Sequence, residues 1–433
     1  MSTPFVIHPL KIKAGQKFFQ TQNCLYSNQI EQLPLQKLGA DRCAFVGTGD
    51  QRQPALYCRD HLMAVRFLPR RWSEAFQAHS ISAATLTDLI CTDLLELRHR
   101  KQRLTHSAGE AFRWVHGDAD GLPGIVVDDY SSIVVLQSGS PLGDFLLEFV
   151  IAALLKTTEK PIFERSSGQI RALEKLPERT RWIREPTRDQ TANIPDTVQT
   201  EIAGLSMSFR PLRCQKTGLF LDQKENLELF KVMSARLGAK SMLDLCSYVG
   251  AWSCAGAAAG MHEFTLVDQD KDALATASIN IAANTPSQLV VPAVTALHGD
   301  LFEILAKLNR DKQSFSAVVA DPPAFTKSAK HVAEAKRAYQ RLTKLASKLV
   351  SAGGVYVACS CSRHIGEEDF YEIVSAALDS DDWCYLGRGR QSPDHTVLAA
   401  DKQSLYLKVL FFERRSSLSQ IGPHAGKPRG DAD

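Results

Sequence analysis

A change of pattern near residue 240 constrains the fold of this chain more than any other sequence feature. From there on, short apolar segments alternate with segments of helical periodicity, which is typical of a parallel sheet covered by helices on both faces. We therefore expect an α/β domain with a mostly parallel sheet. The expected strands are 241–245, 263–267, 290–296, 317–320, 354–358 and 405–412, and the expected helices are 251–259, 271–283 and 331–349.

The first half of the chain shows a different organisation. Short apolar runs broken by turn residues predict a small β domain over residues 1–75, with strands at 7–12, 43–46, 55–57 and 62–67. A helix is expected over 80–103, because apolar residues recur there at helical spacing. It opens a central α+β domain, residues 76–211. The third domain then covers 212–415, and the polar tail 416–433 is predicted to be disordered.

Composition excludes several classes of protein. No stretch of the 433 residues approaches the roughly 18 uninterrupted apolar residues of a membrane span, so we expect a soluble, cytoplasmic protein without a membrane partner. The ten cysteines are scattered and contain no Cys-x-x-Cys pair. Neither a disulfide framework nor a metal site is therefore expected.

The distribution of charge is uneven along the chain. The net charge is only +3, but residues 1–110 hold 14 Lys and Arg against nine Asp and Glu. This surplus suits contacts with the phosphates of a nucleic acid, and we expect Arg66, Arg70 and Arg71 to bind RNA. An ordinary solvated surface explains the same charges equally well.

A cofactor site is predicted where the first strands of the α/β domain end. Asp244 ends one strand, Tyr248 and Gly250 lie in the following turn, and Asp268 ends the next strand. Ligands of open parallel sheets bind at the carboxyl ends of the strands, and a carboxylate there can accept both ribose hydroxyls of a nucleoside. Asp244 is expected near the amino-acid part of the ligand. Because no G-x-G-x-x-G is present to hold a pyrophosphate, S-adenosylmethionine fits better than a dinucleotide.

A third carboxylate, Asp300, follows the next strand and is expected to hold the adenine amino group. Any one such Asp is more often an ordinary loop or cap residue. Three of them at successive strand ends are much more specific for a methyltransferase.

Two segments further on carry candidate chemistry. Asp321 opens an Asp-Pro-Pro segment, whose rigid chain can present the carboxylate to a base edge or to the cofactor, and Phe325 and Lys327 follow as candidate RNA contacts. The next strand runs into Cys359 and Cys361. Cysteines near such a pocket can be reactive when the thiolate is favoured, although free cysteines are also common packing residues.

With these motifs, the chain resembles the large-subunit ribosomal RNA (cytosine-5-)methyltransferase family over nearly its whole length. The supporting segments are Lys11–Gly15, Val115–Gly124, Gln215–Gln223, the Asp-Pro-Pro segment and Ser360–Ser362. The resemblance implies a PUA-like domain, a small α+β domain and a Rossmann-like methyltransferase domain. It also implies S-adenosylmethionine as cofactor and ribosomal RNA, free or partly assembled, as partner. A homodimer is a further option.

The same resemblance implies roles for individual residues. In the family the Gln-Lys-Thr-Gly segment packs against the cofactor, which places Lys216, Thr217, Phe220 and Asp222 near it. The nucleophile is the cysteine of a Ser-Cys-Ser motif, here Cys361. Cytosine carbon 5 becomes reactive only after a thiolate adds to carbon 6. The second cysteine position of some RNA cytosine methyltransferases is held by Pro323-Ala324, so one cysteine must suffice.

Three alternatives remain open from the sequence. Methylation of guanine at nitrogen 7 needs no covalent nucleophile. An adenine-amino methyltransferase is disfavoured, because Ala324 separates the prolines from the aromatic ring of Phe325. A non-catalytic RNA-binding factor for ribosome assembly is the alternative of another class.

Overall fold

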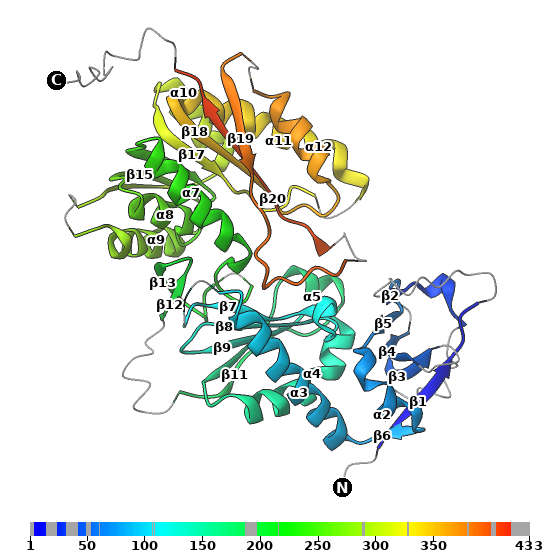
Figure 1. The fold of residues 1–433 in the computed structure, drawn as a ribbon. Helices are drawn as coiled ribbons and strands as arrows, with labels where there is room; N and C mark the ends of the chain where they lie inside the picture. Colours follow the sequence, from blue (N-terminus) through cyan, green and yellow to red (C-terminus); the bar gives the residue numbers. More distant parts are fainter. Residues whose placement is uncertain are drawn as a thin grey trace, which may run out of the picture. The chain divides into compact units, whose positions relative to one another are not determined.

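The computed structural model describes residues 4–13, 24–31, 42–48, 53–59, 61–105, 107, 109–186, 197–214, 216–287, 291–326, 329–378, 381–399 and 404–416. Candidate residue Lys327, Gln215 of the Gln-Lys-Thr-Gly segment and the predicted disordered tail beyond 416 lie outside these ranges. The chain forms two compact units, residues 1–224 with 391–405 and residues 225–390 with 406–433 (Figure 1). The second unit thus contains most of the predicted third domain.

A seven-stranded sheet organises the second unit. Its order is β16-β15-β14-β17-β18-β20-β19. The first five of these strands are parallel, and β20 is antiparallel to both of its neighbours. The strands are β14 Ser241–Leu245, β15 Glu263–Asp268, β16 Ala293–His298, β17 Phe315–Ala320, β18 Val350–Ser360, β19 Trp383–Arg388 and β20 Lys408–Arg414.

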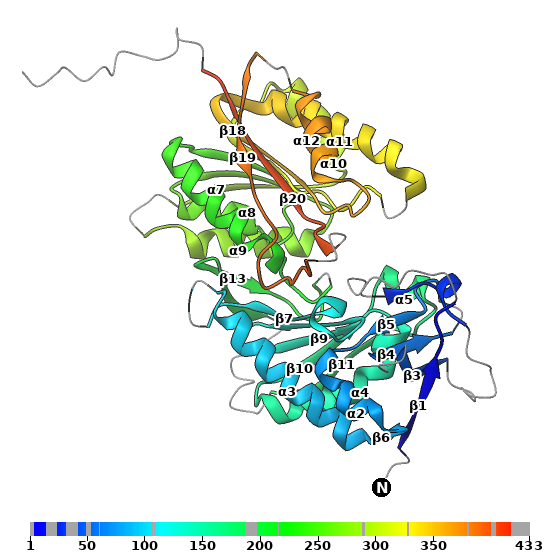
Figure 2. The same ribbon diagram turned by 45° about the vertical axis from the view of Figure 1, so that its right-hand side comes forward.

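Helices cover both faces of this sheet, as Figure 1 and Figure 2 show. On one face lie α7 Lys224–Arg236, α8 Ala251–Ala258 and α9 Lys271–Asn284. On the other lie α10 Leu301–Arg310, α11 Val332–Ala346 and α12 Glu367–Ser375, whose apolar sides form a core with the strands. The inner strands β14, β17 and most of β18 are apolar runs because both of their faces are buried, whereas the edge strands β16 and β19 are exposed or half-buried. The predicted fold class, a Rossmann-like α/β domain, is confirmed.

The first unit combines three sheets. The N-terminal sheet has the order β2-β5-β4-β3-β1-β6, the central sheet β11-β10-β9-β8-β7, and β12 pairs with β13. The strands are β1 Phe5–Leu10, β2 Cys24–Leu25, β3 Cys43–Thr48, β4 Gln53–Cys58, β5 Val65–Phe67, β6 Ser80–Ile81, β7 Phe112–His116, β8 Ile125–Asp129, β9 Val134–Ser138, β10 Ile162–Ser166, β11 Arg179–Arg184, β12 Val198–Ile202 and β13 Leu205–Phe209. The α-helices among the described residues of this unit are α2 Ser73–Gln77, α3 Ala83–Gln102, α4 Pro141–Thr157 and α5 Gln169–Leu173.

The N-terminal and central sheets share one hydrophobic core. It contains Phe45 from β3, Leu94 from α3, Trp114 from β7 and Leu146 from α4. The aromatic rings of Phe45 and Phe145 lie 5.1 Å apart. The residues of the predicted first and second domains are therefore packed as one body within this unit.

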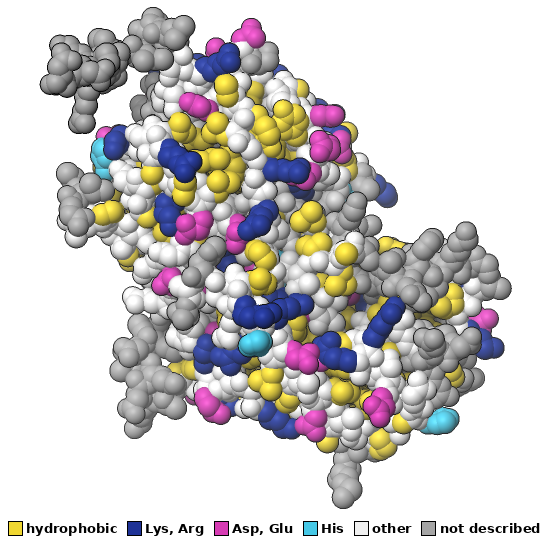
Figure 3. Space-filling view, viewed as in Figure 1, with side chains coloured by type: hydrophobic (Ala, Val, Ile, Leu, Met, Phe, Trp, Pro, Cys, Tyr) yellow, Lys and Arg dark blue, Asp and Glu magenta, His cyan; other side chains and the backbone are white. Residues whose placement is uncertain are grey.

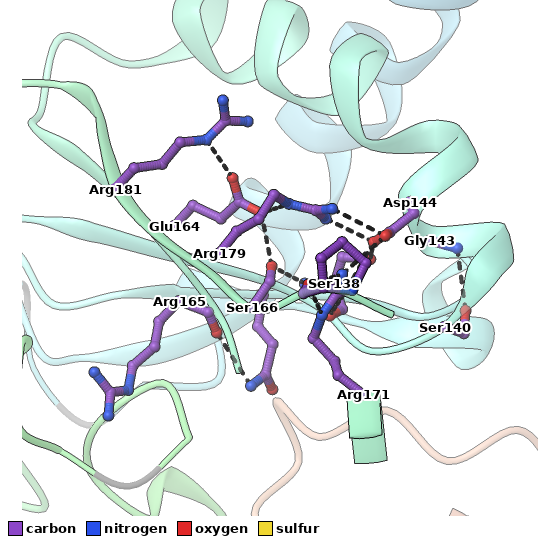
Figure 4. A network of polar contacts seen from close by, with 12 residues as sticks. Ser138, Ser140, Gly143, Asp144, Glu164, Arg165, Ser166, Arg171, Arg179 and Arg181 are labelled. Atoms are coloured by element: carbon purple, nitrogen blue, oxygen red, sulfur yellow. Dashed lines mark hydrogen bonds and ion pairs between the residues drawn. The ribbon is translucent and has the colours of Figure 1, made fainter. Parts of the chain in front are cut away.

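Charged hydrogen bonds from arginines connect the central sheet to α4 and α5. The buried Arg171 guanidinium donates to both carboxylate oxygens of Asp144 at 2.8 and 2.9 Å (Figure 4). Arg179 bridges Asp144 and Glu164, and Arg181 donates to Glu164 at 2.7 Å. These paired charges have a structural function, because buried ions are tolerated only when they are paired.

The sequence placed most of the described strands within a few residues, but of the described α-helices only α3, α8, α9 and α11. The predicted helix 80–103 begins instead at Ala83, because Ser80 and Ile81 pair with β1 and the Ser82 hydroxyl accepts the Thr85 N–H as an N-cap. Helices α2, α4, α5, α7, α10 and α12 and strands β2, β6, β10 to β13 and β19 were not predicted. Among the described residues, no helix is both long and apolar enough to cross a membrane.

Candidate active site

The candidate site lies at the carboxyl edge of the seven-stranded sheet. Strand β14 pairs in parallel with β15 on one side and with β17 on the other, so the strand order reverses there. The register aligns Leu245 with both Val267 and Ala320. Asp268 and Asp321, the next residue of each neighbouring strand, are therefore brought to the same edge. Open α/β sheets bind ligands at this position.

The loop between β14 and α8 has a strained backbone. Cys246, Tyr248 and Gly250 have φ angles of 63°, 49° and 81°, so every second residue is left-handed. Such a conformation costs a non-glycine residue on the order of 1–3 kcal/mol and is concentrated at functional sites. The Tyr248 N–H donates to Asp268 at 2.8 Å, which holds the loop against β15.

Helix packing requires a glycine at position 250, which the sequence alone did not suggest. A Cβ atom on Gly250 would lie 2.9 Å from the Cβ of Ala277 on α9. The missing side chain lets α9 approach the start of α8, in addition to permitting the left-handed φ angle. This contact is sufficient to explain the glycine, and its predicted place beside the cofactor stays a prediction.

Asp244 is a buried carboxylate that lacks a full set of partners. Its Oδ2 accepts a hydrogen bond from Ser253 at 2.7 Å, whereas Oδ1 is buried without any partner. The hydroxyl of Ser247, in the adjacent loop, is also buried without a partner. Burial raises the pKa of Asp244 to about 7, and the negative charges of Asp321 and Asp268 act in the same direction. Two such polar atoms beside one loop fit a site whose ligand completes their hydrogen bonds.

Asp268 and Asp300 hold their own surroundings in place. Asp268 accepts the N–H groups of Tyr248 and Asp270, one on each oxygen, and each carboxylate oxygen retains a second lone pair. Asp300 is exposed and caps α10 by accepting the N–H groups of Phe302 and Glu303 on Oδ1. The cap is sufficient to explain an Asp at 300, and contact with adenine stays a prediction.

The structure brings all four predicted carboxylates around one loop. Burial raises the pKa of the Cys246 thiol, and the charges of Asp268, Asp321, Asp244 and Asp300 raise it further. A cluster of carboxylates favours a cationic ligand. In the described part of the chain, no three His, Cys, Asp or Glu side chains are placed to hold a metal ion.

Asp321 and Phe325 are fixed by aromatic neighbours. Trp252 on α8 donates its indole N–H to the Asp321 carboxylate at 3.0 Å. The Phe325 ring lies edge-on to Tyr339 at 4.7 Å and packs against the core of the second unit. Phe325 thus has a packing role, and base stacking by it remains a prediction.

Cys359 and Cys361 differ in their exposure. Cys359 is buried within β18, paired in register with Val409 of β20. Cys361 follows the end of β18 and is half-buried. Ser360 and Ser362, on either side of it, both lie within hydrogen-bonding distance of the Tyr339 hydroxyl, at 2.9 and 3.2 Å. Of these two cysteines, Cys361 is therefore the one presented at the edge of the sheet.

The Gln-Lys-Thr-Gly segment belongs to the first unit. Lys216 has a left-handed φ of 50° and its ammonium lies over the ring of Phe220 at 5.1 Å. Thr217 is buried, and the carbonyl of Asp222 accepts the N–H of Ser392 at 3.0 Å. Their proposed contact with the cofactor stays a prediction.

The Val115–Gly124 segment has a structural role in the same unit. Asp120 is buried and pairs with Lys101 at 2.6 Å, and Lys224 pairs with Asp394 at 2.9 Å. Lys101 also donates to the Asp394 carbonyl. This buried network anchors residues 391–405 within the first unit.

Comparison with known proteins agrees with this geometry. A family model for S-adenosylmethionine-dependent methyltransferases matches residues 193–394. The ribosomal RNA large subunit methyltransferase I of Shewanella amazonensis is 31% identical over 303 residues, which is 69% of this chain and 73% of the relative. The protein of the same name from Pseudoalteromonas atlantica is 29% identical over 315 residues, 72% and 76% of the two chains.

This chain belongs to the ribosomal RNA large subunit methyltransferase family. A solved structure from Streptococcus mutans, assigned to the SAM-dependent methyltransferases, has the same fold with a TM-score of 0.71 at 18% identity. It covers 94% of this chain and 100% of its own. A second, determined with S-adenosylhomocysteine, has a TM-score of 0.70 at 17% identity and the same coverage. The predicted enzyme class and the cofactor S-adenosylmethionine are confirmed.

Several residues of this methyltransferase site were not predicted. Ser253 and Trp252 bind Asp244 and Asp321 from α8, and Tyr339 and Lys408 approach the Ser-Cys-Ser segment from α11 and β20. Of these four residues, only Lys408 could have been noticed in the sequence, because it is a single positive charge within the otherwise apolar predicted strand 405–412.

We expect cofactor binding to release a proton from Asp244. Its carboxyl is half-protonated near pH 7, and a cationic ligand favours the ionised form. Affinity for S-adenosylmethionine should therefore rise with pH through the pKa of Asp244 and level off about one pH unit above it. Calorimetric titration at pH 6.5, in buffers of different ionisation enthalpy, measures the protons released.

The Asp244→Asn variant should bind more weakly and lose this proton release. Glu263→Gln, at the exposed start of β15, is the matched control and should behave like the unmodified protein. Equal proton release by Asp244→Asn and the unmodified protein would remove Asp244 from the binding site.

Proposed function

We propose that this methyltransferase modifies carbon 5 of a cytosine in large-subunit ribosomal RNA, with Cys361 as the nucleophile. The observation that carries the proposal is the position of Cys361. It is the half-exposed residue that follows β18, the strand next to β17, which ends at Asp321. The resemblance of the Ser-Cys-Ser segment supports this chemistry, and the names of the relatives support the class of RNA.

The covalent route explains why a thiol is needed. The Cys361 thiolate forms a bond to carbon 6 of the cytosine. The electron pair of the double bond between carbons 5 and 6 shifts toward carbon 4 and nitrogen 3, which gives an enamine with a nucleophilic carbon 5. S-Adenosylmethionine, when bound, supplies the electrophilic methyl group that carbon 5 takes up. The carbon-5 proton then leaves to water and its electron pair restores the double bond. The carbon–sulfur bond breaks at the same time and returns its pair to Cys361.

Asp321 is proposed to hold the base during these steps. Trp252 fixes one of its oxygens, and two prolines follow it, so the carboxylate is held with little freedom to move. A rigid acceptor at this edge can bind an amino group of the base without a further loss of entropy.

The decisive variant is Cys361→Ser, which should abolish turnover and leave S-adenosylmethionine binding nearly unchanged. Cys359→Ser, at the buried position two residues earlier, is the matched control and should have a milder effect. RNA containing 5-fluorocytosine has no carbon-5 proton to lose. It should trap the unmodified enzyme, but not Cys361→Ser, as a denaturation-resistant complex seen on a gel.

The opposite result identifies a different base. If Cys361→Ser methylates RNA at near the normal rate and the product is 7-methylguanine, the covalent mechanism is wrong. The guanine alternative then replaces it.

The N-terminal sheet is proposed to be a PUA-like domain that contacts RNA phosphates. Arg66 is paired with Asp118, and Arg71 donates to Asp93 at 2.5 Å. Arg70 is exposed, and no carboxylate of the described ranges lies within ion-pair distance of it. On the face drawn in Figure 3, Lys and Arg side chains are interspersed with acidic ones. We therefore propose that individual arginines, rather than a uniformly basic surface, contact the RNA phosphates.

We expect Arg70→Ala to weaken RNA binding to a similar extent whatever the RNA sequence. It should also reduce the magnitude of the slope of log affinity against log salt concentration by about 1. Filter binding over a salt series measures both effects. The control is Arg310→Ala, which removes an exposed arginine from α10 of the other unit. If the two variants behave alike, the assignment of RNA binding to the N-terminal sheet is wrong.

A further inference from the structure

A buried lysine lies beside the Ser-Cys-Ser segment. Lys408 is the first residue of β20, and only 5% of its surface is exposed. In the antiparallel register of β18 and β20 it is directly opposite Ser360. Its ammonium donates to the carbonyls of Ser362 and of Tyr406. These contacts place the charge alongside the segment that contains Cys361.

The charge of Lys408 is not compensated by a direct ion pair. Within the described ranges, no carboxylate lies within ion-pair distance of its ammonium. Carbonyl groups alone are a poor replacement for water around a buried cation. Burial lowers the pKa of Lys408 to about 8, while the Cys361 thiol and the Glu367 carboxylate act in the opposite direction. The thiol and the ammonium are therefore electrostatically coupled.

The other described groups named for this segment do not supply a buried positive charge. Tyr339 from α11 is a hydroxyl whose pKa is raised by burial, and the Cys361 charge raises it further. Glu367 from α12 is negative and forms an ion pair with Arg388 at 3.0 Å. The exposed Arg363 guanidinium lies over the ring of Tyr406 at 5.9 Å. His364 is also exposed, and Asp321, the residue after β17, is negative.

We propose that Lys408 is a positioning residue that stabilises the thiolate of Cys361 and fixes the Ser-Cys-Ser segment at the end of β18. This inference rests on the proposed function of Cys361 as the nucleophile. A cation near a cysteine favours the thiolate, which is the reactive form of a thiol. The hydrogen bond to the Ser362 carbonyl couples the position of the ammonium to that of the segment. Lys408 needs no contact with the RNA or the cofactor for this role.

Alkylation of Cys361 in the full-length protein, without RNA, tests this inference separately from the enzymatic activity. Iodoacetamide is applied over a pH series, and each cysteine is quantified by peptide mass spectrometry. The midpoint is the pH at which the alkylation rate of a cysteine reaches half of its maximum. In the unmodified protein, Cys361 should have a lower midpoint than the half-buried Cys24 of the N-terminal sheet. Lys408→Met should move the Cys361 midpoint upward and slow its alkylation at pH 7 by at least about threefold. Lys408→Arg should retain part of the effect.

Controls separate an electrostatic role from a structural one. Lys336→Met removes a half-exposed lysine of α11 that pairs with Asp369, and it should leave the Cys361 midpoint unchanged. Turnover by Lys408→Met should recover as the pH is raised, whereas a structural defect would reduce it at every pH. If Lys408→Met does not fold, the midpoints of Cys361 and Cys24 in the unmodified protein still decide.

Two results overturn the inference. One is a Cys361 midpoint in the unmodified protein at or above that of Cys24. The other is a Cys361 midpoint that does not change in folded Lys408→Met. A normal turnover rate for Cys361→Ser would instead overturn the proposed function, and the alkylation result would still hold.

Discussion

The parallel register of β15, β14, β17 and β18 is the constraint on which the rest of the site depends. It aligns Leu245 with Val267 and Ala320, and Ala320 with Ala358, so that β14, β15 and β17 end within one residue of one another and β18 ends two residues further on. Every group of the proposed chemistry follows one of these ends. Because the strand order reverses at β14, helices diverge to the two faces and leave this edge open to a ligand. The same sheet thus places the carboxylates proposed to bind the cofactor and the candidate nucleophile at one edge.

The electrostatic character changes along this edge. Around β14 and its neighbours, Asp244, Asp268 and Asp321 form an acidic surrounding that suits a cationic cofactor. At β18 and β20, the buried ammonium of Lys408 acts on Cys361. A cationic methyl donor and an anionic thiolate need opposite surroundings in one site. Adjacent strands of the sheet provide them.

The periodicity of the sequence predicted the fold well, because strands buried on both faces must be continuous apolar runs. Strand β14 was predicted to the residue, and Asp244, Asp268, Asp300 and Asp321 were found because they follow such runs. Contacts between elements left no comparable pattern. The Trp252 bond to Asp321 and the approach of α9 to Gly250 depend on how helices pack, which one strand or helix alone does not show. The ion pairs of Arg66 with Asp118 and of Arg71 with Asp93 could not be predicted for the same reason.

Mapping modified nucleosides in large-subunit ribosomal RNA tests the central claim most directly. RNA from cells with and without the gene is digested, and its fragments are compared by mass spectrometry. The account predicts that one 5-methylcytidine disappears without the gene and returns when the gene is supplied. Unchanged 5-methylcytidine together with the loss of a 7-methylguanosine would contradict it.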